Sequence, residues 1–343
     1  MSGFGHMLKD YLDYYKISQT EFADRLNISQ KHMNEIINEK TNLSVDMILA
    51  ISLLTEIDTN LIYQVEYQNK VSKYLKEKFK SDKDLKTFLN SYSLKEMNDR
   101  KWIRLKDETS LVQNYIDLIN YLNIKDINMF DSFLEKRYLF KKRDDSDNKK
   151  IYLWIRHCDL MTKDIKIKDY NSNNLNNLLD ELKIEQNNLF DKNRLMNLFN
   201  KYGIILYIED ALKGSKVRGC IRVKINTPVI YMTTYYKEKS SFYFTLYHEL
   251  MHLKHDYNKL KNKVLIENDI EEDNIDLLAL NEMINDKIYE EILNDFENKD
   301  KIAKDNNIPL CFLYSRLAKE GKISYKSKEY LKNVERIEWL IWI

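Results

Sequence analysis

The stretch His248-Glu249-Leu250-Met251-His252 places two histidines four residues apart, with a glutamate directly after the first. Residues four apart on an α-helix project from one face, roughly 6 Å apart at Cβ, so both imidazoles can reach a single metal ion. Glu249 is turned by about 100° from His248 and can stand beside a metal-bound water as its general base. The H-E-x-x-H pattern therefore predicts a helix that carries a zinc hydrolase site.

Two histidines do not complete such a site, because catalytic zinc takes three protein ligands and keeps one position for water. Asn258 stands where the metzincin pattern has its third histidine, so a carboxylate further along the chain is expected. Glu282 opens a predicted helix thirty residues after the second histidine and is the candidate ligand. Glu267, Glu271 and Glu272 are closer in sequence but lie in an acidic stretch that we expect to be solvated.

Other polar residues near the motif are candidates for supporting roles. His255 follows on the same helix face, where a packing role is favoured over one in orienting a ligand. The oxyanion-stabilising group is not identified by the pattern; the nearby candidates are Tyr235, Tyr236 and Tyr247.

Three segments ahead of the motif are predicted to be strands. They span residues 203–208, 219–225 and 229–233, with Pro228 at the turn between the second and the third. We expect a small antiparallel sheet, whose edge strand would hold an extended peptide beside the metal by strand addition.

The N-terminal region predicts a different activity. Short helices follow one another over residues 7–66, with Ser18 and Glu21 as a capping-box pair and Ser29 capping the next helix. Asn27 tolerates the left-handed conformation that a tight turn between the two helices needs. This is a helix-turn-helix arrangement, in which the second helix enters the major groove by its N-terminal residues. The side chains expected to reach bases and phosphates are Gln30, Lys31 and Asn34.

Charge gives this DNA-binding prediction little support. The whole chain has 55 Lys and Arg against 54 Asp and Glu, and residues 1–66 have five against ten. That sign opposes phosphate binding, although residues 67–110, with twelve basic and seven acidic residues, would help. Specific contacts from a homodimer would still suffice. The alternative is a helical bundle that serves only as a protein-interaction module.

We predict a mostly α, α+β chain of three parts. Residues 1–66 form a five-helix helix-turn-helix domain, residues 67–170 a helical connector, and residues 171–343 a zincin-like domain with a helical tail. The basic run 136–150 is expected to be an exposed loop. The apolar C-terminal stretch 339–343 is expected to dock onto the body of the protein.

The compartment is predicted from what the sequence lacks. No apolar run approaches the roughly 20 residues that span a bilayer, and no basic start leads into an apolar signal segment. Cys158, Cys220 and Cys311 have no metal-ligand or redox spacing and suit a reducing environment. A cytoplasmic protein without a membrane partner is expected.

The segment Phe242-Tyr-Phe-Thr-Leu-Tyr-His-Glu-Leu-Met-His252, preceded by Gly203-Ile and Pro228-Val-Ile230, resembles the ImmA/IrrE-type metallopeptidases. In that family a Phe-Thr-Leu-x-His-Glu-Leu-x-His segment carries two zinc histidines and the base, and a later Glu-x-x-Ala-Asn-x-Phe-Ala segment supplies the third ligand. The resemblance implies Zn²⁺ as cofactor. It implies zinc binding by His248, His252 and Glu282, and a catalytic base at Glu249. The second segment departs from the family pattern at Asn285, Asp286 and Ile288.

The N-terminal part is similar to HigA-type antitoxin repressors. Residues 19–37 follow their helix-turn-helix, and residues 60–68 resemble their closing segment, although Asn27 and Glu39 stand where such domains often have glycine. The connector and the tail also resemble long HigA-like antitoxins that carry this peptidase domain, in Arg100-Lys-Trp-Ile103, Trp154-Ile-Arg156, Ala303, Ile308-Pro309 and Arg316-Leu-Ala318.

Together the resemblances imply a DNA-binding transcriptional regulator coupled to a zinc endopeptidase that cleaves a specific regulatory protein. Its partners would be operator DNA, expected in its own promoter, and the protein substrate. The alternative is a HigA-like antitoxin and autorepressor that neutralises a cognate toxin, with the zinc domain acting as sensor or scaffold. A purely protein-binding module is the third possibility.

Overall fold

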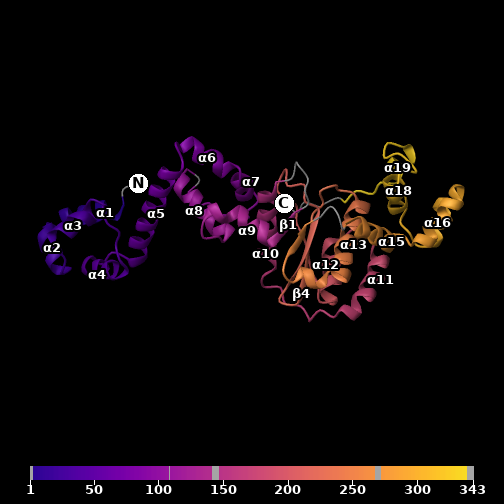
Figure 1. The fold of residues 1–343 in the computed structure, drawn as a ribbon, viewed down its shortest axis with the longest axis horizontal. Helices are drawn as coiled ribbons and strands as arrows, with labels where there is room; N and C mark the ends of the chain where they lie inside the picture. The colour runs from indigo at the N-terminus through magenta and orange to yellow at the C-terminus, as the bar shows by residue number, and fades with distance from the viewer. Residues whose placement is uncertain (1–2, 108, 141–146, 267–271, 338–343) are drawn as a thin grey trace. The chain divides into compact units, whose positions relative to one another are not determined.

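The computed structural model describes residues 3–107, 109–140, 147–266 and 272–337 (Figure 1). The chain divides into two compact units, residues 1–125 and 126–343, each of which is described by itself. The first predicted boundary, after residue 66, falls inside the long helix α5, and the boundary between the units falls inside the predicted connector. The connector is therefore divided between the two units.

The described part of the first unit is helical. Its helices are α1 Phe4–Tyr15, α2 Gln19–Arg25, α3 Gln30–Ile37, α4 Val45–Thr55, α5 Thr59–Lys78, α6 Asp82–Asn90, α7 Leu94–Asp99 and α8 Leu111–Leu122.

The predicted turn between α2 and α3 is confirmed in detail. The Ser18 hydroxyl accepts a hydrogen bond from the backbone N–H of Glu21, which caps α2. The Ser29 hydroxyl caps α3 in the same way. Asn27 adopts a φ of 54°, the left-handed conformation that the turn requires.

One apolar core fixes the five N-terminal helices. Its buried side chains come from α1 to α5 and are Phe4, Leu8, Leu12, Phe22, Ala23, Met33, Ile36, Ile37, Ile48, Ile51 and Ile62. Each large apolar side chain removed from water contributes about 1.5–3 kcal/mol, so this core holds α2 and α3 at a fixed angle.

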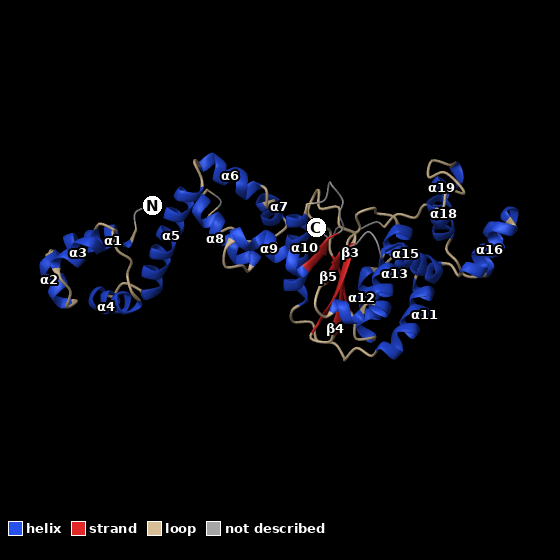
Figure 2. Cartoon of the chain, viewed as in Figure 1, coloured by secondary structure: helices blue, strands red, loops and turns tan. Residues whose placement is uncertain are grey.

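The second unit combines helices with one sheet (Figure 2). Its helices are α9 Phe130–Arg137, α10 Asn148–Thr162, α11 Leu175–Glu185, α12 Lys192–Lys201, α13 Lys239–His255, α14 Tyr257–Leu260, α15 Glu272–Met283, α16 Asp286–Asn294, α17 Lys299–Asp305, α18 Leu310–Lys319 and α19 Lys328–Asn333. Short 3₁₀ helices span Ile127–Met129, Ser172–Asn174 and Phe296–Asn298. Its strands are β1 Tyr138–Phe140, β2 Ile205–Ile208, β3 Gly219–Lys224, β4 Thr227–Met232 and β5 Val264–Ile266. None of the described helices in either unit is long and apolar enough to span a membrane.

The sheet is mixed, which corrects the predicted antiparallel arrangement. The strand order is β1-β5-β3-β4-β2, with β2 parallel to β4, β1 parallel to β5, and β3 antiparallel to both of its neighbours. The prediction assumed that consecutive strands pair, but β2 lies beside β4. In this order β1 and β2 are the outer strands of the sheet, and β3 lies inside it.

Two local predictions are also corrected. Pro228 lies within β4, opposite Val223, and the turn is made instead by Ile225 and Asn226, both with positive φ. The predicted loop 136–150 contains the end of α9, strand β1 and the start of α10; its residues 141–146, like the C-terminal stretch 339–343, lie outside the described residues.

The two faces of the sheet are covered by different helices. Trp154 of α10 packs edge-on against Tyr231 of β4, whereas the neighbouring residues Ile230 and Met232 join the core with α13. Side chains alternate along a strand, so α10 and α13 lie on opposite faces, as Figure 2 shows. Helix α13 is thus held between β3 and β4 on one side and α15 and α18 on the other.

Candidate metal centre

His248 and His252 lie on α13 with their rings facing each other. Their Nε2 atoms are 3.1 Å apart, and the side chains are only 7% and 8% exposed. Two zinc–nitrogen bonds in a tetrahedral arrangement would place the nitrogens roughly 3.3 Å apart. The structure therefore brings two of the predicted ligands together at a spacing that suits one zinc ion.

The opposite ring nitrogens are held by carboxylates. Nδ1 of His248 lies 2.9 Å from Oδ1 of Asp276, and Nδ1 of His252 lies 2.8 Å from Oδ2 of Asp256. Burial raises the pKa of Asp276, but the hydrogen bond from His248 and the charge of Lys319 outweigh it and bring that pKa to about 2. An ionised carboxylate only accepts hydrogen bonds, so each Nδ1 is the protonated nitrogen. In the neutral rings each Nε2 then presents a lone pair.

Two facing lone pairs repel each other unless a proton or a cation lies between them. Burial, followed by the charge of His248, lowers the pKa of His252 to about 4 although Asp256 opposes the shift. Protonation of this ring is thus disfavoured near neutral pH. A metal cation satisfies both lone pairs, and histidines whose second nitrogen is hydrogen-bonded to a carboxylate are the usual ligands of zinc. The residues present fit the predicted ion.

Glu249, the predicted base, is buried beside the pair. It is 2% exposed and lies on α13 with its carboxylate against β3. A Cβ added at Gly219, the first residue of β3, would lie 3.0 Å from the Glu249 Oε1 atom. Glycine is therefore the only residue at position 219 that lets the Glu249 carboxylate keep its observed position.

The described side chains do not bring the third predicted ligand to the pair. Glu282 of α15 forms ion pairs with Lys183, at 2.9 Å, and with Lys254, at 3.7 Å. No group of three His, Cys, Asp or Glu residues that could hold a metal occurs among the described residues. The alternatives Glu267 and Glu271, and the side chain of Glu272, lie outside the described part of the chain.

The remaining candidates near the motif are now placed. His255 is exposed at the end of α13, so the predicted packing role is wrong. Tyr247 is buried and donates a hydrogen bond to Gln186 at 2.9 Å. Tyr235 and Tyr236 are each 46% exposed, and Tyr236 accepts a hydrogen bond from Arg218.

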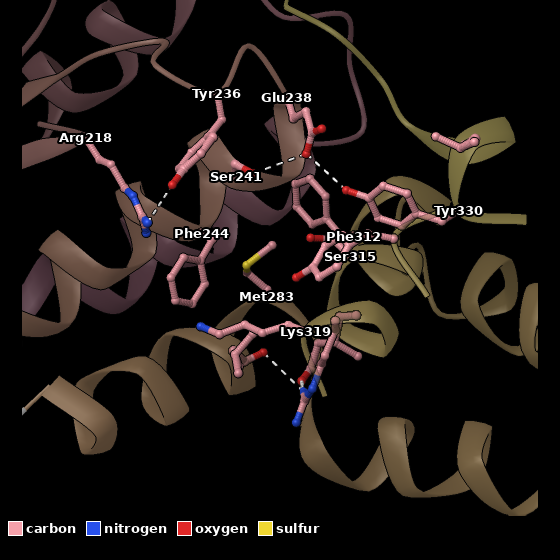
Figure 3. Close-up of a pocket in the computed structure, with 15 residues that line it drawn as sticks. Arg218, Tyr236, Glu238, Ser241, Phe244, Met283, Phe312, Ser315, Lys319 and Tyr330 are labelled. Carbon is pink, nitrogen blue, oxygen red and sulfur yellow. Dashed lines mark hydrogen bonds between the residues drawn. The ribbon is translucent and has the colours of Figure 1, made fainter. Parts of the chain in front are cut away.

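A pocket of about 570 Å³ adjoins the N-terminal half of α13 (Figure 3). Its apolar lining consists of Phe244, Leu280, Met283, Ile284, Phe312 and Leu331. At its rim the Glu238 carboxylate accepts hydrogen bonds from Ser241 and Tyr330, as Figure 3 shows. The pocket thus combines an apolar interior with polar groups that are bonded to one another.

This pocket shares residues with the histidine pair. The rings of Phe244 and His248, one helical turn apart on α13, have centroids 6.3 Å apart. Lys319 lies over the Phe244 ring at 3.7 Å and also bonds to Asp276 at 3.0 Å. A side chain that occupies the pocket would therefore lie beside the candidate metal site.

In the first unit, the structure places Gln30, Lys31 and Asn34 on the exposed face of α3. Gln30 donates a hydrogen bond to the hydroxyl of Thr20 in α2, and Asn34 accepts one from Asn38. The three predicted DNA contacts thus share one accessible face of the second helix of the motif.

Comparison with known proteins supports this unit. Residues 8–62 match the helix-turn-helix family model. No curated protein and no solved structure matches the chain. The N-terminal region is therefore a helix-turn-helix domain, and the chain is a DNA-binding transcriptional regulator.

The sequence reasoning missed four residues that support the site. Asp256 had a usable signal, because it follows His252 by four residues and so shares its helix face. The other three residues had no such sequence signal, because each reaches α13 from a segment far away in the chain. They are Asp276, Lys319 and Gly219.

Proposed function

We propose that the chain couples DNA binding to a zinc-dependent endopeptidase that cleaves a specific regulatory protein. The observation that carries the proposal is the facing pair of Nε2 atoms on His248 and His252, with Glu249 buried beside it. A structural zinc site would have no use for that glutamate. The helix-turn-helix domain favours a regulatory substrate over a digestive role.

The chain's own residues have distinct roles in this reaction. A bound zinc ion would supply Lewis-acid activation of the water and of the scissile carbonyl. Glu249 accepts the proton of the attacking water and passes it to the leaving amine. Asp276 and Asp256 hold the two imidazoles through their Nδ1 atoms, so that both Nε2 atoms would be available to bind the ion.

For the third ligand we propose Glu272 in place of Glu282. Glu272 is the first residue of α15 and precedes Asp276 by one helical turn along the chain. In this register the family segment Glu-x-x-Ala-Asn-x-Phe-Ala also matches at Ala279, whereas from Glu282 only the glutamate matches. Its other defined positions hold Ile275, Asp276 and Leu278. Glu282 is instead engaged by two lysines.

The two assignments are separated by matched variants. Glu272→Gln should weaken zinc binding by about 100-fold or more, whereas Glu282→Gln should leave it within about threefold, because only the former removes a ligand. Zinc affinity is measured by competition with a chromophoric chelator. The reverse ranking would restore Glu282 as the ligand.

The proposed activity is tested with the zinc-loaded full chain and the proteins encoded beside its gene. Cleavage is followed by electrophoresis, and the cut bond is located by mass spectrometry. Glu249→Gln should abolish cleavage while zinc stays bound, since the variant lacks the base but keeps both imidazoles. Failure of the wild-type protein to cut any of these proteins would contradict the peptidase proposal.

The second candidate is the antitoxin-like autorepressor, of which the helix-turn-helix match supports the DNA-binding part. Here the histidine pair would sense zinc or hold the fold, and Glu249→Gln would leave regulation unchanged. Repression of the chain's own promoter is compared for wild-type and variant protein, with and without an adjacent toxin. Equal repression by both, together with toxin neutralisation, would favour this candidate over the peptidase.

A further inference from the structure

A second pocket in the same unit is strongly basic. It has a volume of about 260 Å³ and is lined by residues of α9, β1, β3 and the loop before β5. Its cationic lining residues are Arg137, Arg222, Lys224, Lys261 and Lys263. No carboxylate lines it among the residues that the structure describes. We call it the basic pocket.

The fold explains why these cations converge. Arg222 and Lys224 are two residues apart on β3 and so point to one face of the sheet. Lys261 and Lys263 lie in the loop that leads into β5, which pairs with β3. Arg137 is the last residue of α9. Segments far apart in sequence thus bring five positive charges to one concavity.

Asp159 compensates only part of this charge. Its carboxylate pairs with the guanidinium of Arg222 and, at 2.6 Å, with the ammonium of Lys224, and it also accepts a hydrogen bond from Tyr231. One negative charge is therefore shared by two cations. The Arg137, Lys261 and Lys263 side chains are exposed and form no ion pair with a described residue.

Arg222 and Lys224 are crowded together and share Asp159 as their acidic partner. The Arg222 side chain is 17% exposed, and its buried Nε has no hydrogen-bond partner among the described residues. Burial, followed by the charge of Arg222, lowers the pKa of Lys224. Crowded like charges cost free energy, and an anion bound among these cations would offset that cost.

We propose that the basic pocket binds the phosphoryl group of a small molecule, either free phosphate or a phosphate monoester. A guanidinium and several ammonium groups around one concavity match the geometry of phosphate oxygens. The cations surround a pocket rather than following a stripe along the surface, which disfavours a nucleic-acid backbone. Phe133 and Tyr138 also line the pocket and provide a surface for the organic part of an ester.

The test is calorimetric titration of the full chain with inorganic phosphate and, separately, with adenosine monophosphate. The neutral chelator 1,10-phenanthroline is present so that phosphate cannot bind through a metal. We expect saturable binding at constant ionic strength. Tighter binding of the monoester would assign the pocket to a phosphate ester, and equal or tighter binding of inorganic phosphate would assign it to the free ion.

The test variant and its control each remove three exposed, positively charged side chains. Replacing Arg137, Lys261 and Lys263 together by alanine should weaken phosphate binding at least about tenfold, because each removes a charged contact. The control replaces the equally exposed Lys301, Lys304 and Lys322 and should bind as the wild type does. Absence of saturable binding, equal weakening in both triple variants, or binding of duplex DNA without binding of either phosphate probe would overturn the proposal.

Discussion

Removal of the carboxylate that holds either histidine should weaken zinc binding at the pair. Asp276 and Asp256 accept the Nδ1 hydrogen bonds of His248 and His252 at 2.9 and 2.8 Å. Loss of such a partner typically costs about 10- to 100-fold in metal affinity, or roughly 1.4–2.7 kcal/mol. We expect Asp276→Ala and Asp256→Ala each to fall in this range.

The structure ranks the two variants. Asp276 also binds Lys319 at 3.0 Å, so its removal leaves a cation without its carboxylate close to His248. Asp256 has only a weaker lysine neighbour, Lys259 at 3.8 Å. We therefore expect Asp276→Ala to lie nearer 100-fold and Asp256→Ala nearer 10-fold. The double variant should lose about 10³-fold if the two rings are held independently.

Affinity is measured by competition between the full chain and a chromophoric chelator. Added zinc should also raise the melting temperature less in the variants than in the wild type, because stabilisation follows the ratio of free ligand to Kd. Asp164→Ala is the matched control, since that side chain is 89% exposed. Unchanged affinity in both single variants would refute the orienting role of the carboxylates. Unchanged affinity in His252→Ala as well would refute the metal site itself.

Three further predictions concern the base, the DNA and pH. Gly219→Ala should slow cleavage at least about tenfold in a peptide assay but leave zinc affinity unchanged. The reason is that the added Cβ would lie 3.0 Å from the Glu249 carboxylate. An unaffected rate would show that the carboxylate has room to move. Replacing Gln30 and Lys31 by alanine should weaken promoter binding by about 10- to 100-fold. It should also reduce the slope of log affinity against log salt concentration by about one, measured by fluorescence anisotropy at several salt concentrations. An unchanged slope would exclude a phosphate contact by Lys31. In metal-free protein, the free energy of unfolding should fall by up to about 3 kcal/mol as the pH decreases from about 6.5 to about 4, because His252 is protonated in the unfolded chain but stays neutral when folded. Urea titrations of the wild type and of His252→Gln test this, and identical pH profiles would contradict it.

Local patterns were sufficient for the helices of both motifs. The capping serines, the left-handed Asn27 and the apolar spacing predicted α2 and α3, because these features act within one or two helical turns. The same locality explains the histidine pair. A spacing of four residues on a helix determines which side chains share a face, so His248 and His252 were predictable without knowledge of their surroundings.

The sheet and the support of the site were not predictable in this way. The pairing of β2 with β4, the hydrogen bond from His248 to Asp276 and the contact of Gly219 with Glu249 all join segments far apart in the chain. Such contacts depend on how the apolar faces of the elements pack, and sequence spacing carries no information about that packing. The H-E-x-x-H sequence by itself therefore determined which residues could bind a metal. Only the tertiary structure decided that Asp276 binds the Nδ1 atom of His248 from a distant segment, and that the two Nε2 atoms are left facing each other.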